Sequence, residues 1–140
     1  MNKLKLIVVT LTFMILATAC VDNEKNKLDN RALDYWNYKI NRQFSEAYQI
    51  LSPGWRKTED LKSFEQRMII SKARWLNAKF KDKECTQPDL CTVTMTIEYE
   101  YKFKTSGSKS IKVESDVKET WILKDNMWYH LPLDKKMSQK

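Results

Sequence analysis

The sequence predicts one α+β domain, with helices in the first half of the chain and antiparallel strands in the second. Apolar residues recur at steps of three or four between residues 30 and 70, as on one face of a helix. From about residue 72 they alternate with polar residues, as in a strand with one buried face. Because the two periods occupy separate halves, we expect the helices to pack on one face of a single sheet.

The segment before the domain has the parts of a secretory signal. Residues 1–19 begin with two lysines, continue with an apolar run at 6–16 and end in small residues, and Cys20 follows directly. The apolar run is shorter than the roughly 20 residues of a membrane-spanning helix. We therefore expect residues 1–19 to be a leader that is removed on export.

The small residues before Cys20 resemble the lipobox of bacterial lipoproteins, although Ala17 holds the position where that family usually has Leu. The resemblance implies that Cys20 carries a lipid and anchors the mature chain in a membrane. Val21 follows in place of Asp, which by the sorting rule of enterobacterial lipoproteins implies the outer membrane, facing the periplasm. The inner membrane and the cell surface stay open, as does an ordinary signal peptide that a cysteine follows by chance.

The helical half begins after a polar stretch. Residues 20–29 are expected to form a flexible tether, and the helical spacing then runs from 30 to 51, with a possible break near Asn41. The predicted buried face consists of Leu33, Trp36, Ile40, Phe44, Ala47, Tyr48 and Leu51. Residues 52–54 give a turn signal, and Thr58 offers an N-cap for a further amphipathic helix.

About four strands are expected in the second half. Residues 76–80 alternate first, 93–103 alternate most clearly, and the apolar positions between 111 and 123 continue on odd numbers. A hairpin centred on Gly107 would pair odd residues with odd residues, so both strands would present apolar side chains to the same side.

The last strand and the domain boundaries follow from the turn signals. Asp125 and Asn126 predict a tight turn, and a strand limited by Pro132 follows it. We expect the domain to span residues 30–133 and the polar residues 134–140 to form a tail.

Cys85 and Cys91 are the remaining cysteines, and in an oxidising compartment such a pair predicts a disulfide that pins the connection between two strands. A zinc site is disfavoured because the chain has one His and no further thiols. A redox-active pair is the other alternative, but it would more often be spaced by two residues.

The order of elements also resembles the NTF2-like (cystatin-like, cone-shaped) superfamily, in its small bacterial lipoprotein branch. A Tyr-x-x-Leu-Ser-Pro element at 48–53 and a Trp-x-Leu…Trp-Tyr element at 121–129 carry the resemblance, which covers roughly residues 29–133. It implies a cone whose concave sheet face and helices enclose a pocket. It implies no activity, because that superfamily contains enzymes, ligand binders and scaffolds.

The formal charge of +7 is compatible with binding to nucleic acid, with binding to an anionic surface or with no specific partner. For an exported chain we do not expect nucleic acid, while lipopolysaccharide, anionic phospholipid and cell-wall polymers stay open. The alternation places Lys79, Lys81 and Lys83 on one outward face, with Lys102 and Lys104 nearby. This stripe would bind an anionic envelope polymer or partner, or it is a solvated face that discourages edge pairing.

Two sets of residues offer chemistry. His130, the only His, would act as an acid or base near neutral pH, with Glu119 as its orienting carboxylate, or it is a partly buried structural residue. Aromatic residues would line a pocket with His130 or simply fill the core. The predicted pocket set is Trp36, Trp75, Tyr99, Tyr101, Trp121 and His130.

The sequence thus favours a non-catalytic, lipid-anchored module for interaction or assembly in the cell envelope. The alternative is a binder of a small hydrophobic ligand in the cone, or an enzyme that uses His130. The sequence has no Gly-rich phosphate loop, His-rich metal motif or Gly-x-Ser-x-Gly elbow, and we expect no cofactor. An open cavity of several hundred Å³ would favour the binder, and a cone filled by aromatic side chains would favour the module.

Overall fold

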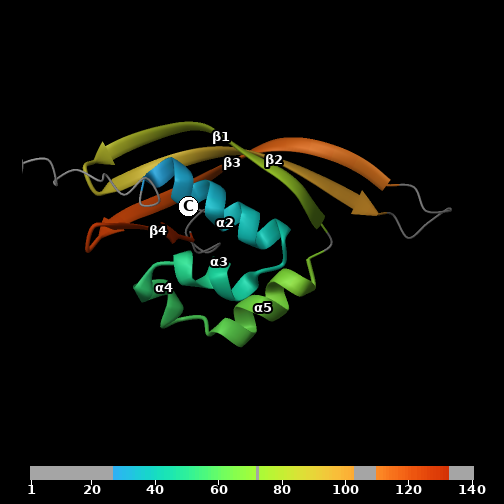
Figure 1. Ribbon diagram of the computed structural model, residues 1–140, viewed down its shortest axis with the longest axis horizontal. Coiled ribbons are helices and arrows are strands. Elements are labelled where there is room, and N and C mark those ends of the chain that lie inside the picture. The colour runs from blue at the N-terminus through green and yellow to red at the C-terminus, as the bar shows by residue number, and fades with distance from the viewer. Residues whose placement is uncertain (1–26, 72, 103–109, 133–140) are drawn as a thin grey trace, which may run out of the picture.

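The computed structural model describes residues 27–71, 73–102 and 110–132, so Cys20, Lys104, the leader and the polar tail lie outside the described residues. The helices are α2 (Leu28–Ile40), α3 (Phe44–Ile50), α4 (Pro53–Arg56) and α5 (Leu61–Ile69). The strands are β1 (Ala73–Gln87), β2 (Leu90–Lys102), β3 (Ser110–Lys124) and β4 (Met127–Leu131). They form one antiparallel sheet in the order β1-β2-β3-β4, which arches over the helices (Figure 1). The predicted α+β class is confirmed.

The helical half begins earlier than expected and breaks where expected. α2 starts at Leu28, inside the predicted tether, because Leu28 is buried in the core. Arg42, with φ of 60°, interrupts the helical run between α2 and α3. The buried side chains of α2 are Leu28, Ala32, Tyr35, Trp36 and Lys39. The predicted face was therefore rotated, since Leu33 and Ile40 are only half-buried.

Side-chain caps mark the starts of α4 and α5. Ser52 caps α4 by accepting a hydrogen bond from the Trp55 amide at 3.2 Å. Asp60, and not Thr58, caps α5, because its carboxylate accepts from the Ser63 amide at 2.7 Å. The hydroxyl of Thr58 instead donates to the carbonyl of Trp55.

The central hairpin has the predicted faces in a different register. Odd residues of β2 pair with odd residues of β3, and Tyr101 lies opposite Ile111. A hairpin centred on Gly107 would have placed Val113 opposite Tyr101. The register therefore differs by two residues, and a shift of two leaves every side chain on its expected face.

β1 departs from simple alternation. Its ladder with β2 skips Leu76, Lys81 and Thr86, so the buried face continues from Ala78 to Trp75 and not to Leu76. Ala78 and Phe80 lie on the apolar face as predicted, opposite Ile97 and Met95. Leu76 is not part of the apolar face that it was expected to begin.

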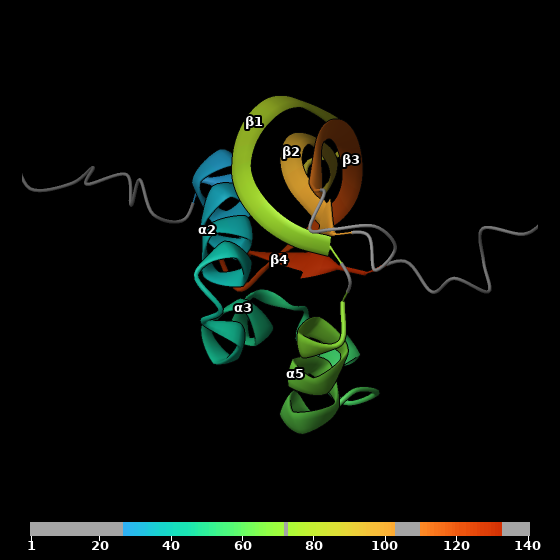
Figure 2. The same cartoon turned by 90° about the vertical axis from the view of Figure 1, so that its right-hand side faces the viewer.

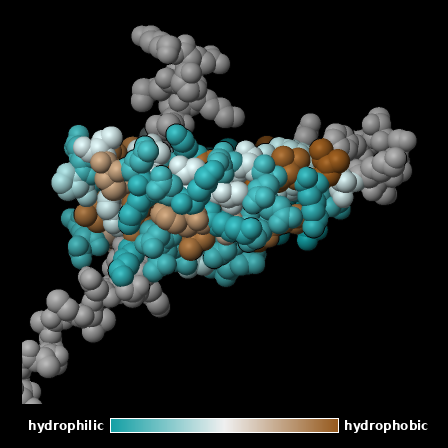
Figure 3. Space-filling view, turned by 90° about the horizontal axis from the view of Figure 1, so that it is seen from above, coloured by the Kyte–Doolittle hydropathy of each residue, from teal (hydrophilic) through white to brown (hydrophobic). Residues whose placement is uncertain are grey.

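The predicted lysine stripe is interrupted for the same reason. Lys83 lies opposite Val93, on the other face from Lys79. Lys79 lies 3.9 Å from Glu114, and Lys81 forms an ion pair with Asp116. The convex face, largely hydrophilic in Figure 3, thus carries both signs of charge.

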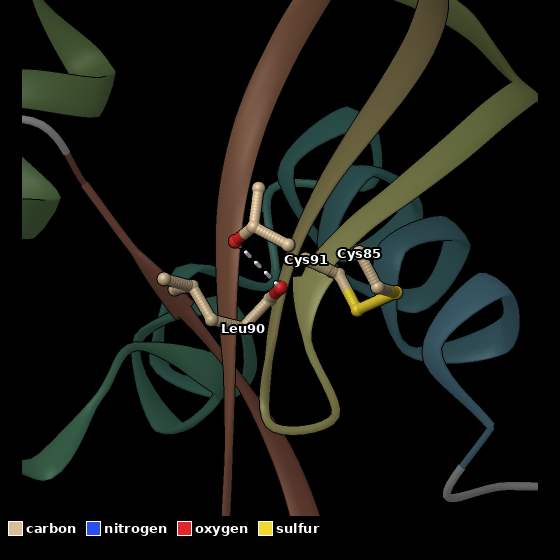
Figure 4. The surroundings of a disulfide bond; sticks show 4 residues. Cys85, Leu90 and Cys91 are labelled. Atoms are coloured by element: carbon tan, nitrogen blue, oxygen red, sulfur yellow. Dashed lines mark hydrogen bonds between the residues drawn. A yellow bond between two sulfur atoms is a disulfide. The ribbon is translucent and has the colours of Figure 1, made fainter.

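The predicted disulfide is present. Cys85 and Cys91 lie directly opposite one another in β1 and β2 and are bonded (Figure 4). The two strands extend further than the expected alternating segments, so the connection between them is the short turn between Gln87 and Leu90. Thr86 donates to the Leu90 carbonyl across this end of the hairpin.

The last turn and strand agree with the prediction. Asp125 and Asn126 have φ of 50° and 58°, the left-handed values that a two-residue hairpin turn requires. β4 then places His130 opposite Trp121, and it ends just before Pro132.

The core lies between the concave face of the sheet and the helices. Seen along the sheet, β1, β2 and β3 curl strongly and α2 lies beside them (Figure 2). Trp121, Phe64, Ile50, Leu51 and Met95 are the largest of the fully buried side chains. A backbone hydrogen bond of 2.8 Å from the Ser52 amide to the His130 carbonyl ties the helical segment to β4.

Candidate functional site

Three ionisable side chains from three elements lie inside the core. Lys39 of α2, Glu119 of β3 and His130 of β4 are exposed by 7%, 6% and 8%. Glu119 shares a strand face with Trp121, and Trp121 pairs with His130, so the sheet register brings the two ionisable groups together. Lys39 follows Tyr35 by one helical turn and therefore enters the same core.

His130 is sealed by aromatic rings. Its imidazole lies 4.7 Å from the ring of Tyr35 and 5.4 Å from that of Trp121, between centroids. Burial, with a smaller effect of the Lys39 cation, lowers the pKa of His130 to about 3. The imidazole is therefore neutral at physiological pH.

Glu119 is the nearest carboxylate to that imidazole. Its Oε1 lies 3.9 Å from Nε2 of His130, which is too long for a hydrogen bond. Burial raises the pKa of Glu119 to about 7, while Lys39 and the indoles of Trp36 and Trp121 act in the opposite direction. Neither indole N–H forms a hydrogen bond with a described residue. Since both groups are neutral between pH 3 and 7, the contact with His130 is no ion pair there.

Lys39 is held differently, by aromatic faces. Its ammonium lies 3.4 Å from the ring centroid of Trp36, 4.7 Å from that of Trp75 and 4.9 Å from that of Tyr35. Burial lowers the pKa of Lys39 to about 8, although the negative charge of Glu119 opposes this shift. Among the residues that the structure describes, no carboxylate lies within ion-pair distance of Nζ and no acceptor bonds to it.

Lys39 also lies on a cavity of about 490 Å³, where the end of α2 meets the start of β1. Its apolar lining comes from Ile40, Phe44, Met68, Ile69, Ala73 and Trp75. Its charged lining comes from Lys39, Arg42, Arg74 and Lys102, against one carboxylate, Glu100. We call this the open-end cavity. Glu100 is already 3.9 Å from Arg74, so the lining has an excess of positive charge.

The structure separates the residues that were predicted to line one pocket. Trp75 lines the open-end cavity, whereas Trp36 and Trp121 are packed in the core, 5% and 0% exposed. Tyr99 and Tyr101 contact each other edge-on near the same end of the sheet, with ring centroids 5.2 Å apart. His130 does not line the open-end cavity.

Sequence reasoning missed Lys39 and Tyr35. The signal was present, because Lys39 follows Tyr35 and Trp36 by four and three residues and so shares their side of the helix. A lysine on an aromatic stripe was the observation that would have identified it.

A second hollow, of about 800 Å³, lies at the opposite end, near α4. It is wide and open, and its lining includes Trp55, Glu59, Ile122 and Lys124. No group of three or more potential metal ligands occurs in residues 27–71, 73–102 and 110–132. Over the same ranges, no helix has the length and apolarity to cross a bilayer.

Comparisons with known proteins give similarity in structure alone. No protein-family model matches the sequence, and no curated protein is significantly similar to it. A SEC-C motif containing protein from Rhodopseudomonas palustris is similar in structure, with a TM-score of 0.59, 11% identity and coverage of 78% of this chain and 80% of that one.

Two further solved structures are similar. A SEC-C motif containing protein from Psychrobacter arcticus has a TM-score of 0.52 and 12% identity; the match covers 69% of this chain but 54% of that protein, so this chain spans about half its length. An NTF2-like protein of unknown function from Prochlorococcus marinus has a TM-score of 0.37 and 15% identity, with coverage of 56% and 66%. At 11% and 12% identity, the two similarities with TM-scores above 0.5 show a shared α+β fold alone.

Proposed function

We propose that this protein is a non-catalytic binding module, anchored by lipid on Cys20 in the cell envelope, whose ligand occupies the open-end cavity. The observation that carries the proposal is the cavity itself, which combines apolar walls with the buried ammonium of Lys39. Its volume of about 490 Å³ is within the range of small-molecule sites, roughly 300–1,000 Å³.

The position of His130 supports a non-catalytic role. A general base has to be within hydrogen-bond reach of the group from which it takes a proton. His130 is covered by Tyr35 and Trp121, and it does not line the open-end cavity. Its lowered pKa also makes it a weak base.

Blocking the cavity tests the binding function. The neutral fluorescent probe N-phenyl-1-naphthylamine is titrated into the full chain in zwitterionic nanodiscs, with empty nanodiscs as the blank. Ala73→Trp places an indole in the open-end cavity and is expected to abolish probe binding. Ile122→Trp, in the hollow near α4, is the matched control and should leave binding unchanged. The proposal is rejected if the unmodified chain does not bind the probe. It is also rejected if Ile122→Trp abolishes probe binding and Ala73→Trp does not.

The anchor is tested separately. Cys20→Ser removes the thiol that lipidation needs, so the chain is expected to leave the membrane fraction. Mass spectrometry of the unmodified protein should find an acylated chain that begins at Cys20. A chain that retains Met1, or a bare sulfur at position 20, would contradict the anchor without affecting the cavity.

A second candidate function is an interaction module for an envelope protein. Four large apolar side chains among the described residues are more than a third exposed: Ile69, Ile70, Tyr101 and Ile111. All lie at the open end, because Tyr101 lies between Ala73 and Ile111 in the sheet and α5 ends close to Ala73. Photo-crosslinking from position 70, with position 118 on the convex face as control, should give one discrete adduct in intact cells. Equal adducts from both positions would reject this function.

A further inference from the structure

We infer that the ligand of the open-end cavity is a single-chain amphiphile with a carboxylate head, and that Lys39 provides its counter-charge. This inference rests on the proposed binding function and names its ligand class. Three independent features of the cavity support it: the unfilled hydrogen-bonding capacity of one ammonium, the charge of the lining and the shape of the apolar wall.

The ammonium of Lys39 has three N–H donors. The rings of Trp36, Trp75 and Tyr35 stabilise its charge but provide no oxygen or nitrogen acceptor in line with those donors. Glu119 is near enough to interact electrostatically, but it is outside ion-pair distance. Nζ of Lys39 is not among the fully buried polar atoms that lack a partner, and it lines the cavity, so solvent reaches it there. An anion in the cavity would give these donors a charged acceptor in place of water.

The remaining lining also favours an anion. Arg42 and Arg74 are exposed and provide guanidinium groups, which bind carboxylates in a bidentate way. Lys102 adds a third exposed cation, and Glu100 is engaged by Arg74. A cationic ligand would meet this excess of positive charge, and a neutral ligand would leave Lys39 without an acceptor.

The rest of the wall needs an apolar partner. Phe44, Met68 and Ile69 line the cavity. Ile70, which follows Ile69 in the chain, is 77% exposed. A small anion such as acetate would contact Lys39 but would leave these side chains uncovered. An alkyl chain attached to the carboxylate would cover them, and each further buried methylene should strengthen binding about fourfold.

The test compares ligands that differ only in their head group. Octanoate, 1-octanol and octylammonium are titrated by calorimetry into the full chain in zwitterionic nanodiscs, against empty nanodiscs. We expect octanoate to bind about 10- to 100-fold more tightly than 1-octanol, because one charge-assisted contact is gained. Decanoate, with two more methylenes, should bind about 15-fold more tightly still. Acetate and octylammonium should not bind measurably.

Variants locate the effect. Lys39→Met keeps the length of the side chain and removes its charge, so octanoate and 1-octanol should then bind within about threefold of each other. Lys118→Met, an exposed lysine of β3 away from the cavity, should change neither affinity.

Different outcomes would reject the proposed binding function and the carboxylate inference. If neither octanoate nor 1-octanol binds, the proposed binding function is rejected. If both bind equally to the unmodified chain, or Lys39→Met keeps the preference, the function stands and the carboxylate inference is rejected. Should Lys39→Met not fold, the preference of the unmodified chain for octanoate over 1-octanol decides the inference, and its absence would overturn it.

Discussion

The two ends of the sheet differ in how completely their side chains are buried. At the closed end, a row across the sheet joins Cys85, Cys91, Trp121 and His130, with a disulfide between the first two. At the open end, the corresponding row is Ala73, Tyr101 and Ile111, whose last two members are 38% and 47% exposed.

Packing against aromatic rings has different effects on the titratable side chains at the two ends. His130 loses its charge because it is buried at the closed end, 8% exposed, and its Nδ1 has no hydrogen-bond partner among the described residues. Lys39 lies against aromatic faces as well, but it borders a cavity and retains a pKa of about 8. The same core thus contains His130, which is neutral at physiological pH, and Lys39, which is charged below about pH 8 and borders a cavity.

The largest expected effect is the difference in free energy of unfolding that is lost when one aromatic side chain is removed from each end. Trp121→Ala removes a fully buried indole from the closed end and should lower the free energy of unfolding by about 3–5 kcal/mol. Tyr101→Ala at the open end should cost less than about 1 kcal/mol, because its ring is already partly in solvent. Urea unfolding of both variants measures the contrast. Equal losses would mean that the open end is part of the rigid core.

The next effect concerns pH and the buried pair at the closed end. The raised pKa of Glu119 adds stability that is lost as pH rises from about 4.5 to 7. The lowered pKa of His130 adds stability that is lost as pH falls from about 6.5 to 3. Between pH 4.5 and 6.5 the two slopes oppose each other, so we expect a nearly flat stability profile.

Glu119→Gln should expose the His130 slope. Without the titrating carboxyl, the free energy of unfolding should rise with pH by up to about 1.4 kcal/mol per unit, or about 2–3 kcal/mol between pH 4.5 and 6.5. Chemical unfolding at several pH values measures this. A profile as flat as that of the unmodified chain would show that His130 is not buried in a neutral form.

A smaller effect tests the disulfide of the closed end. The bond closes a short loop, with a sequence separation of 6, so reduction should lower the free energy of unfolding by only about 2 kcal/mol. Urea unfolding with and without reductant gives the value, and the same experiment on a Cys85→Ala, Cys91→Ala variant is the control. If reduction unfolded the domain outright, the packing of Trp121 would not be what holds this end together.

The smallest effect is expected on the convex face. Lys81→Ala breaks the ion pair with Asp116, but both side chains are about half exposed, at 54% and 43%. Such pairs contribute little in water, so the urea midpoint should be unchanged within error. A clear loss would indicate that the skipped residue at position 81 fixes the path of β1.

Much of this fold was predictable because local chemistry determines it. Asp125 and Asn126 tolerate the left-handed backbone, and the alternation of β2 determines its buried face. Two features were not predictable in this way. Leu76 and Lys81 interrupt the β1 ladder without a glycine to mark them, and α2 has two neighbouring stripes, of which packing selects the one that contains Lys39.

The candidate site was predictable where strand register determines it, and not where the packing of the helices determines it. The pairing of Trp121 with His130 followed from the turn, and the nearness of Glu119 followed from that pairing. Which aromatic residues fill the core and which line a cavity depends on how the helices cover the sheet. Trp36 and Trp75 contact the same ammonium, yet only Trp75 of the two lines the open-end cavity.

The central claim is that Lys39 is a buried, charged receptor on the open-end cavity, and its own titration tests this most directly. Nuclear magnetic resonance of the lysine side chains would follow Lys39 between pH 6 and 11, with and without octanoate. We expect a pKa of about 8 in the free protein, raised when octanoate is bound and unchanged by 1-octanol. A pKa at the ordinary value of 10.5, insensitive to either ligand, would contradict the account.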